Sequence, residues 1–218
     1  MSAEKPRERP ILFNDQMVRA ILEGRKTATR RIAKPVKHPD LGNIYAPGAL
    51  VLEREPQHVI DRACPYGQPG DRLWVREAWQ GPLISDEEQA ANQSWWKDMT
   101  KFQNPGHCAY RASGDDNEYV DPDGYFHCKW KPSIHMPRWA SRILLEITAV
   151  RVERLQDITR SGIRAEGLQC PPELCSDDVS PNYRDWYPAA WRELWESTGG
   201  DWDANPWVWV VEFKRVTP

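Results

Sequence analysis

The sequence lacks the common motifs of phosphate-binding, serine hydrolase and zinc protease sites. It has no glycine-rich phosphate loop, no Gly-x-Ser-x-Gly elbow and no His-Glu-x-x-His motif. It also has no apolar run near the roughly 20 residues that a membrane-spanning helix needs, and its first ten residues are charged and proline-containing rather than signal-like. We therefore expect a cytoplasmic protein that does not contact a membrane.

A strongly basic charge is absent as well. The formal net charge is −3, whereas proteins that coat nucleic acid by charge alone are strongly basic. A local basic stretch over residues 25–37 still permits binding of a nucleoside or a short single strand. The five cysteines are an odd number in a chain of 218 residues, which is long enough to form a core without disulfides, so we expect no disulfide framework.

Two His-Cys dipeptides are the main candidate for a zinc site, and Cys170-x-x-x-x-Cys175 in a proline-containing loop is a weaker one. His107-Cys108 and His127-Cys128 together supply two imidazoles and two thiols, which is a sufficient set for tetrahedral zinc. Adjacent residues on a strand point to opposite faces, however, and the spacing differs from the usual Cys-x-x-Cys pairs. We therefore expect no metal and no cofactor.

The hydrophobic pattern predicts strands interspersed with three short helices. We expect helices over residues 14–23, 158–168 and 189–197, each with a glycine at or just beyond its C-terminal end, and strands over 49–54, 59–62, 72–77, 108–112, 125–130, 142–154 and 208–216. The connections are too irregular for a doubly wound sheet. The predicted fold is therefore α+β, a mixed β-barrel with short helices packed outside.

The pattern predicts one domain with two interruptions. Residues 1–10 are expected to be a disordered lead, and residues 11–218 a single domain. Near 80–132 the periodicity is lost among polar, aromatic and turn residues, and near 169–185 a proline-containing loop follows the second predicted helix. We interpret both stretches as insertions.

The most informative segment is the basic run that follows the first predicted helix, Gly24-Arg25-Lys26-Thr27-Ala28-Thr29-Arg30-Arg31. It interleaves four cationic side chains with two threonine hydroxyls and contains little apolar surface. One interpretation is a solvated basic loop. The other is a site that handles an anion or a carbonyl group, in which a lysine and a hydroxyl are held together.

Four blocks of the sequence resemble the ASCH domain of the PUA-like superfamily, in the order found in that family. They are the basic run read as Gly24-x-Lys26-x-x-Thr29-x-Arg31, then Gly70-Asp71-x-Leu73-x-Val75, Leu145-Glu146-Ile147-Thr148 and Val211-Glu212-Phe213-Lys214. The resemblance implies a PUA-like fold and a similarity to the short bacterial N4-acetylcytidine amidohydrolases. The segments at 70–79 and 133–142 look more like the longer ASCH proteins of phages and prophages.

The resemblance also implies a catalytic trio of Lys26, Thr29 and Glu166. The lysine and threonine of the family motif fall on Lys26 and Thr29, and the family's glutamate, counted from the block that ends at Thr148, falls on Glu166. Thr29 or a water would be the nucleophile, Lys26 the activating amine and Glu166 the proton carrier. Because Lys26 and Thr29 are three residues apart, this arrangement requires a bend between them. The alternative is a surface lysine, an ordinary strand threonine and a surface helix acid.

Five further residues are candidates for substrate binding. Arg31 matches the arginine of the family motif and would face an oxyanion, a ribose oxygen or a phosphate oxygen. Trp74 and Arg76 share one face of the strand at 72–77, either to stack on a base and bind an oxygen or as a packed aromatic and a paired arginine. His135 and Arg138 precede the long strand, as a pocket wall or as structural residues.

These observations give one leading functional hypothesis and two alternatives. The leading hypothesis is a cofactor-free hydrolase that removes an acyl group from a modified pyrimidine base or nucleoside, such as N4-acetylcytidine. The first alternative is a non-catalytic PUA-like module that binds RNA or modified nucleotides. The second is a ribonuclease. The expected partner is a small nucleoside or base, with RNA as a further candidate.

Overall fold

The computed structural model describes residues 5–91, 94–120, 123–127, 129–171 and 181–217. The chain divides into two compact units, and each is described by itself. The first unit consists of Met1–Arg7, Ala20–Arg72 and Glu146–Arg215, and the second of Glu8–Arg19, Leu73–Leu145 and Val216–Pro218. Among the described residues, no helix combines the length and the apolar character that crossing a bilayer demands.

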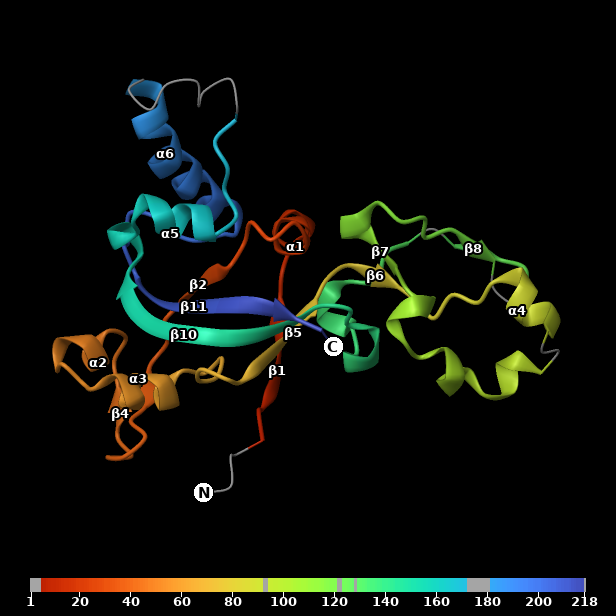
Figure 1. Ribbon diagram of the computed structural model, residues 1–218, viewed down its shortest axis with the longest axis horizontal. Helices are drawn as coiled ribbons and strands as arrows, with labels where there is room; N and C mark the ends of the chain where they lie inside the picture. The colour runs from red at the N-terminus through yellow and green to blue at the C-terminus, as the bar shows by residue number, and fades with distance from the viewer. Residues whose placement is uncertain (1–4, 92–93, 121–122, 128, 172–180, 218) are drawn as a thin grey trace. The chain divides into compact units, whose positions relative to one another are not determined.

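The main sheet has five strands, hydrogen-bonded in the order β1-β5-β10-β11-β2. Their bounds are Glu8–Leu12 for β1, Ala28–Ile32 for β2, Arg72–Arg76 for β5, Leu144–Arg154 for β10 and Trp207–Val216 for β11. The long strands β10 and β11 curve side by side in Figure 1. Strands and helices of this kind confirm the predicted α+β class. Within the described residues β1 and β2 are the two ends of this hydrogen-bonded series, and closure of the sheet into a barrel stays a prediction.

Helix α1 (Asp15–Leu22) forms where the sequence predicts it. The Asn14 side-chain oxygen accepts a hydrogen bond from the Met17 amide at 2.9 Å, which satisfies one of the free amides of the first turn. Val18 and Ile21 are buried, and Gly24 adopts a φ of 76°, the left-handed conformation that ends a helix. The predicted helix and its terminating glycine are therefore confirmed.

Helix α5 (Arg160–Ala165) is short and is fixed at both ends. The Thr159 hydroxyl accepts from the Gly162 amide at 3.1 Å and caps the first turn. At the other end, the Thr27 amide donates to the Ala165 carbonyl at 2.8 Å, which joins α5 to the start of β2. Gly167, with a φ of 94°, ends the helix as the sequence predicts.

Helix α6 (Pro181–Ser197) begins earlier than the predicted 189–197 and runs through Pro188. Its aromatic residues Tyr187, Trp191 and Trp195 are buried in one core cluster with Ile163 of α5 and the valines at 208 and 210. These aromatic residues therefore form the buried face of the helix. Residues 172–180, which belong to the proposed second insertion, lie outside the described residues.

Two predicted strands are wrong. Residues 49–54 and 59–62 contribute instead to α2 (Ala49–Leu52) and α3 (Gln57–Ala63). Short apolar runs do not distinguish a strand from a buried helical turn by periodicity alone, and each of these runs buries only one or two side chains. Between β2 and α2 the chain forms a small hairpin of β3 (Val36–Lys37) and β4 (Ile44–Tyr45).

Residues 8–10, which we expected to be disordered, are the first part of β1.

The second unit has short elements around a small core of Trp79, Tyr110, Met136 and Ala140. Its strands and helix are β6 (Trp79–Gln80), β7 (Ala109–Tyr110), β8 (Tyr119–Val120), β9 (Phe126–His127) and α4 (Asp86–Ala91). The single-turn 3-10 helices of the chain are η1 (Trp95–Lys97), η2 (Met99–Phe102), η3 (Pro105–His107), η4 (Arg111–Ser113), η5 (Ser133–His135), η6 (Arg138–Ala140) and η7 (Leu155–Asp157). The organisation as one domain with two insertions stays a prediction.

Candidate functional site

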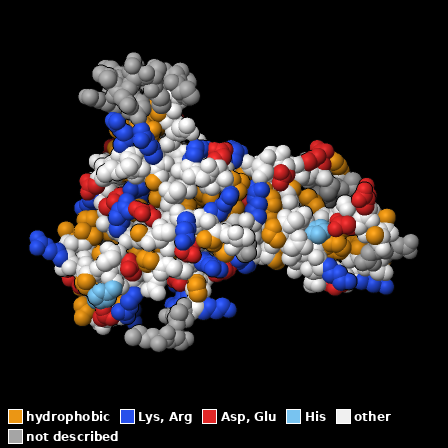
Figure 2. Space-filling model, in the orientation of Figure 1, with side chains coloured by type: hydrophobic (Ala, Val, Ile, Leu, Met, Phe, Trp, Pro, Cys, Tyr) orange, Lys and Arg blue, Asp and Glu red, His pale blue; other side chains and the backbone are white. Residues whose placement is uncertain are grey.

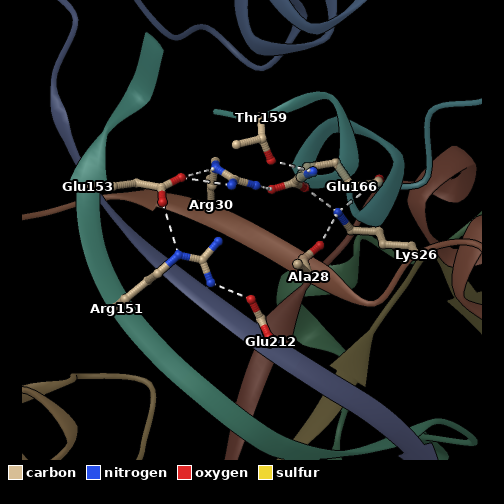
Figure 3. Close-up of polar contacts among 9 residues, drawn as sticks. Lys26, Ala28, Arg30, Arg151, Glu153, Thr159, Glu166 and Glu212 are labelled. Carbon is tan, nitrogen blue, oxygen red and sulfur yellow. Dashed lines mark hydrogen bonds and ion pairs between the residues drawn. The ribbon is translucent and has the colours of Figure 1, made fainter. Parts of the chain in front are cut away.

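Lys26 and Glu166 lie in direct contact, although 140 residues separate them in the sequence. The Lys26 Nζ donates to Glu166 Oε2 at 2.5 Å, to the Glu166 backbone carbonyl at 3.1 Å and to the Ala28 carbonyl at 2.8 Å. Figure 3 shows the amine reaching between β2 and the end of α5. An ammonium has three hydrogens, and each has an acceptor in this arrangement. The two residues that the ASCH resemblance pairs are therefore in contact.

Both members of this ion pair are buried, and burial is the largest influence on the pKa of Lys26. The side chains of Lys26 and Glu166 are 0% and 3% exposed. Burial lowers the pKa of the Lys26 ammonium, the Glu166 carboxylate opposes this shift, and the charges of Arg31 and Arg30 add to it. A buried ion pair of this kind is costly to break from one side, because the remaining charge loses its partner.

Thr29 is buried on β2 but is not among the acceptors that hold the Lys26 amine. Successive side chains of a strand point to opposite faces, so Thr29 lies on the face opposite to Ala28 and Arg30. It pairs across the sheet with Val211. The structure thus brings Lys26 and Glu166 into contact, and the catalytic role of the trio stays a prediction.

A cleft of about 310 Å³ lies in the first unit beside α5. We call it the α5 cleft. It is lined by residues of β2, β10, β11 and α5 and by the residues directly before β2 and α5, and these are Thr27, Ala28, Arg30, Thr148, Arg151, Thr159, Ser161, Gly162, Ala165, Glu212 and Phe213. Its polar groups are four hydroxyls, two guanidinium groups and one carboxylate. Lys26, Thr29 and Glu166 are not lining residues.

Arg30 joins the α5 cleft to the buried pair (Figure 3). Its Nη1 donates to Glu166 Oε1 at 3.1 Å, and its Nε and Nη2 donate to Glu153 Oε1 at 2.9 and 2.7 Å. The other oxygen of Glu153 accepts from Arg151 Nε at 3.0 Å, and Arg151 Nη1 donates to Glu212. The two arginines of the cleft are therefore held by a continuous series of carboxylates.

Gly162 allows Arg30 to lie against the helix. A Cβ at this position would be 3.0 Å from Arg30 Nη2 and 3.4 Å from Thr159 Oγ1. The neighbouring hydroxyls of Thr159 and Ser161 are 2.9 Å apart at the rim of the cleft. The first turn of α5 thus presents two hydroxyls and a bare backbone to the cleft.

Arg31, the first predicted binding residue, shares the face of β2 that carries Thr29. Burial lowers its pKa, and the charges of Tyr66 and Glu166 act in the opposite direction. Arg31 is not a lining residue of the α5 cleft.

The other four predicted binding residues belong to the second unit. The Arg76 guanidinium lies 4.7 Å from the centre of the Trp74 ring, so these two side chains stack on each other. His135 is exposed in η5, and Arg138 Nε donates to Glu8 Oε2 at 2.8 Å. None of the four lines the α5 cleft, and their role in binding stays a prediction.

In the part of the chain that the structure describes, no three His, Cys, Asp or Glu side chains are grouped to hold a metal ion. Both ring nitrogens of His107 have protein partners, Glu88 Oε1 at 2.8 Å and Asn104 Oδ1 at 3.1 Å. Cys108 is a free thiol, and His127 lies in β9. Cys128, the fourth member of the candidate zinc set, lies outside the described residues.

The sequence analysis missed the acids and the second arginine of the network, Glu153, Arg151 and Glu212. A signal was available, since all three are charged residues within otherwise apolar strands. Charged groups at the edge of a core need partners close by. The sequence does not say which partner each one has, because that depends on the alignment of β10 with β11.

Neither a protein-family model nor a curated protein sequence matches this chain. Two solved structures are similar to it. One is an ASCH domain from Lactobacillus crispatus JV V101, with 15% identity and a TM-score of 0.32, in a match that covers 92% of this chain and 72% of that one. The other is an Enterococcus faecalis V583 protein of the DUF984 family model, with 12% identity and a TM-score of 0.33, covering 100% and 84%. TM-scores this low carry no argument about function.

Proposed function

We propose that this chain is an ASCH-type module that binds a pyrimidine nucleoside in the α5 cleft. The cleft itself carries the proposal. Its volume of about 310 Å³ lies at the lower end of the range typical of small-molecule sites. Its arginines supply donors, Glu212 supplies an acceptor and its hydroxyls supply both. A cytosine edge and a ribose present donors and acceptors together, which is the mixture that such a lining complements.

Binding without chemistry fits the position of Lys26 better than catalysis does. A general base needs a free lone pair within reach of the substrate, directly or through one water. The Lys26 amine is enclosed and has an acceptor for each hydrogen of the ammonium form. A ligand in the cleft would meet Arg30 rather than Lys26. On this proposal, Lys26 and Glu166 fix the wall of the cleft.

A second candidate is hydrolysis of an N4-acetylcytidine-like amide. It is favoured by the 2.5 Å contact between Lys26 and Glu166, the two positions that the ASCH resemblance marks as catalytic. In this reaction water adds to the amide carbonyl, the C–N bond breaks, and the exocyclic nitrogen takes a proton as acetate leaves. No observation in the described residues favours the ribonuclease alternative, and basic and acidic side chains are interspersed on the face shown in Figure 2.

The binding proposal predicts a measurable effect of filling the cleft. Ser161 is exposed at its rim, so Ser161→Tyr should fold normally and weaken the binding of cytidine and N4-acetylcytidine by about tenfold or more, equivalent to about 1.4 kcal/mol. Isothermal titration calorimetry on the full chain measures this change. Ser197→Tyr on α6 is the matched control and should stay within about twofold of the unchanged protein. Equal affinity for the two variants would contradict the assignment of the cleft.

A turnover assay separates the two candidates. We expect that N4-acetylcytidine incubated with a high concentration of the protein releases no acetate and no cytidine, as measured by chromatography. Release of both products would establish the hydrolase instead. In that case Lys26→Arg, which keeps the positive charge, should abolish release if the amine is the activating group.

A further inference from the structure

Glu212 and Arg151 form an ion pair in the wall of the α5 cleft. Their side chains are 42% and 40% exposed, so a ligand that enters from solvent can reach both groups. Without Glu212, Arg151 would be the group that an anionic ligand binds, because a guanidinium group donates paired hydrogen bonds to phosphate and carboxylate oxygens. In this structure a protein carboxylate already holds that position.

The two arginines of the cleft belong to a hydrogen-bonded network of six charged side chains whose charges are balanced. Lys26, Arg30 and Arg151 are connected by hydrogen bonds to Glu153, Glu166 and Glu212. Three cations therefore face three anions. Arg30 donates to two of these carboxylates, and its side chain is only 1% exposed, which leaves Arg151 as the arginine that solvent reaches more easily.

A phosphate in the cleft would have to approach the Glu212 carboxylate. The two negative charges would repel each other, or the phosphate would displace Glu212 from Arg151. In both cases the phosphorylated ligand would bind the cleft more weakly than an uncharged one. An uncharged nucleoside avoids this penalty and can still donate a hydroxyl or amino hydrogen to Glu212. One carboxylate can therefore decide between the two kinds of ligand.

We propose that Glu212 is the specificity-determining residue of the α5 cleft: by neutralising Arg151 it admits an uncharged pyrimidine nucleoside and rejects the corresponding 5′-phosphate. This inference rests on the proposed function, since it concerns the ligand of the same cleft. It assigns a role to a residue that lies outside the Lys26, Thr29 and Glu166 trio.

The test is the ratio of two dissociation constants, for cytidine 5′-monophosphate and for cytidine, measured by isothermal titration calorimetry on the full chain. Glu212→Gln keeps the size of the side chain and removes its charge. We expect the ratio to fall by about tenfold or more in this variant, and the variant to bind inorganic phosphate more tightly than the unchanged protein does. The pair is half exposed, so its loss should cost at most about 1 kcal/mol of stability and the variant should fold.

Two controls isolate the effect of position. Glu146→Gln removes the same charge from β10, where Glu146 pairs with Lys214 at 2.8 Å and does not line the cleft, and should leave the ratio within about twofold. Glu212→Asp keeps the charge and should keep the discrimination. If Glu212→Gln binds both ligands with an unchanged ratio, the role of Glu212 is wrong and the proposed function stands. If the unchanged protein binds neither ligand, nor N4-acetylcytidine, the proposed function and this inference are both overturned.

Discussion

Replacing Lys26 with methionine is expected to lower the free energy of unfolding by about 3–5 kcal/mol. The substitution keeps most of the side-chain volume but removes the ammonium that is held by the Glu166 carboxylate and by two backbone carbonyls. The Glu166 charge would then remain buried with Arg30 as its remaining ion-pair partner. Urea denaturation followed by tryptophan fluorescence measures the change.

The control for this prediction is an exposed ion pair in the same unit. Lys214 pairs with Glu146 at 2.8 Å, and its side chain is 60% exposed, so Lys214→Met should cost less than about 1 kcal/mol. Adding Glu166→Gln to Lys26→Met should restore part of the lost stability, because the buried carboxylate that has lost the Lys26 ammonium is then uncharged. A Lys26→Met variant as stable as the Lys214→Met variant would show that the ammonium is not a structural support.

Gly167→Ala should also destabilise the protein strongly, by about 2–5 kcal/mol. Gly167 has a φ of 94°, which L-residues rarely adopt. A Cβ there would lie 2.8 Å from the Ala20 Cβ and 3.1 Å from the Lys26 Cβ, so α1 and the chain around Lys26 would have to shift. Thermal and urea unfolding would both report the loss.

Gly199→Ala separates the two sources of this penalty. Gly199 has a similar φ of 82°, but a Cβ there would meet nothing within 4 Å. Its substitution should therefore cost only the backbone strain, about 1–2 kcal/mol. If the two alanine variants are equally stable, the close approach at Gly167 makes no contribution and the packing argument is wrong.

The elements that the sequence predicts correctly have strong local signals. Helix α1 has a side-chain cap, an apolar stripe and a terminating glycine, and strands β5, β10 and β11 have long apolar or alternating patterns. The short helices α2 and α3 were mistaken for strands because four to seven residues contain too little periodicity to decide. Tertiary packing, rather than local pattern, determines such short elements.

The candidate site was only partly predictable for a different reason. The resemblance to the ASCH domain implies that Lys26 and Glu166 act together, and the two-residue period of a strand implies that Lys26 and Thr29 need a bend between them. The α5 cleft and its series of ion pairs depend on how β2, β10 and β11 align and on where α5 lies beside them. That alignment is a property of the folded chain, and no local segment encodes it.

Helix α5 is held by hydrogen bonds at both ends, and this affects the rate and the affinity with which the α5 cleft binds a ligand. A helix of six residues is not stable alone in water, so its geometry here depends on the Thr159 cap and on the links from Lys26 and Thr27. Most of the conformational entropy of α5 is therefore lost when the protein folds, and little more is lost when a ligand binds. Preorganisation of this kind favours affinity from few contacts, and we expect association in a single kinetic step without a slow closing motion.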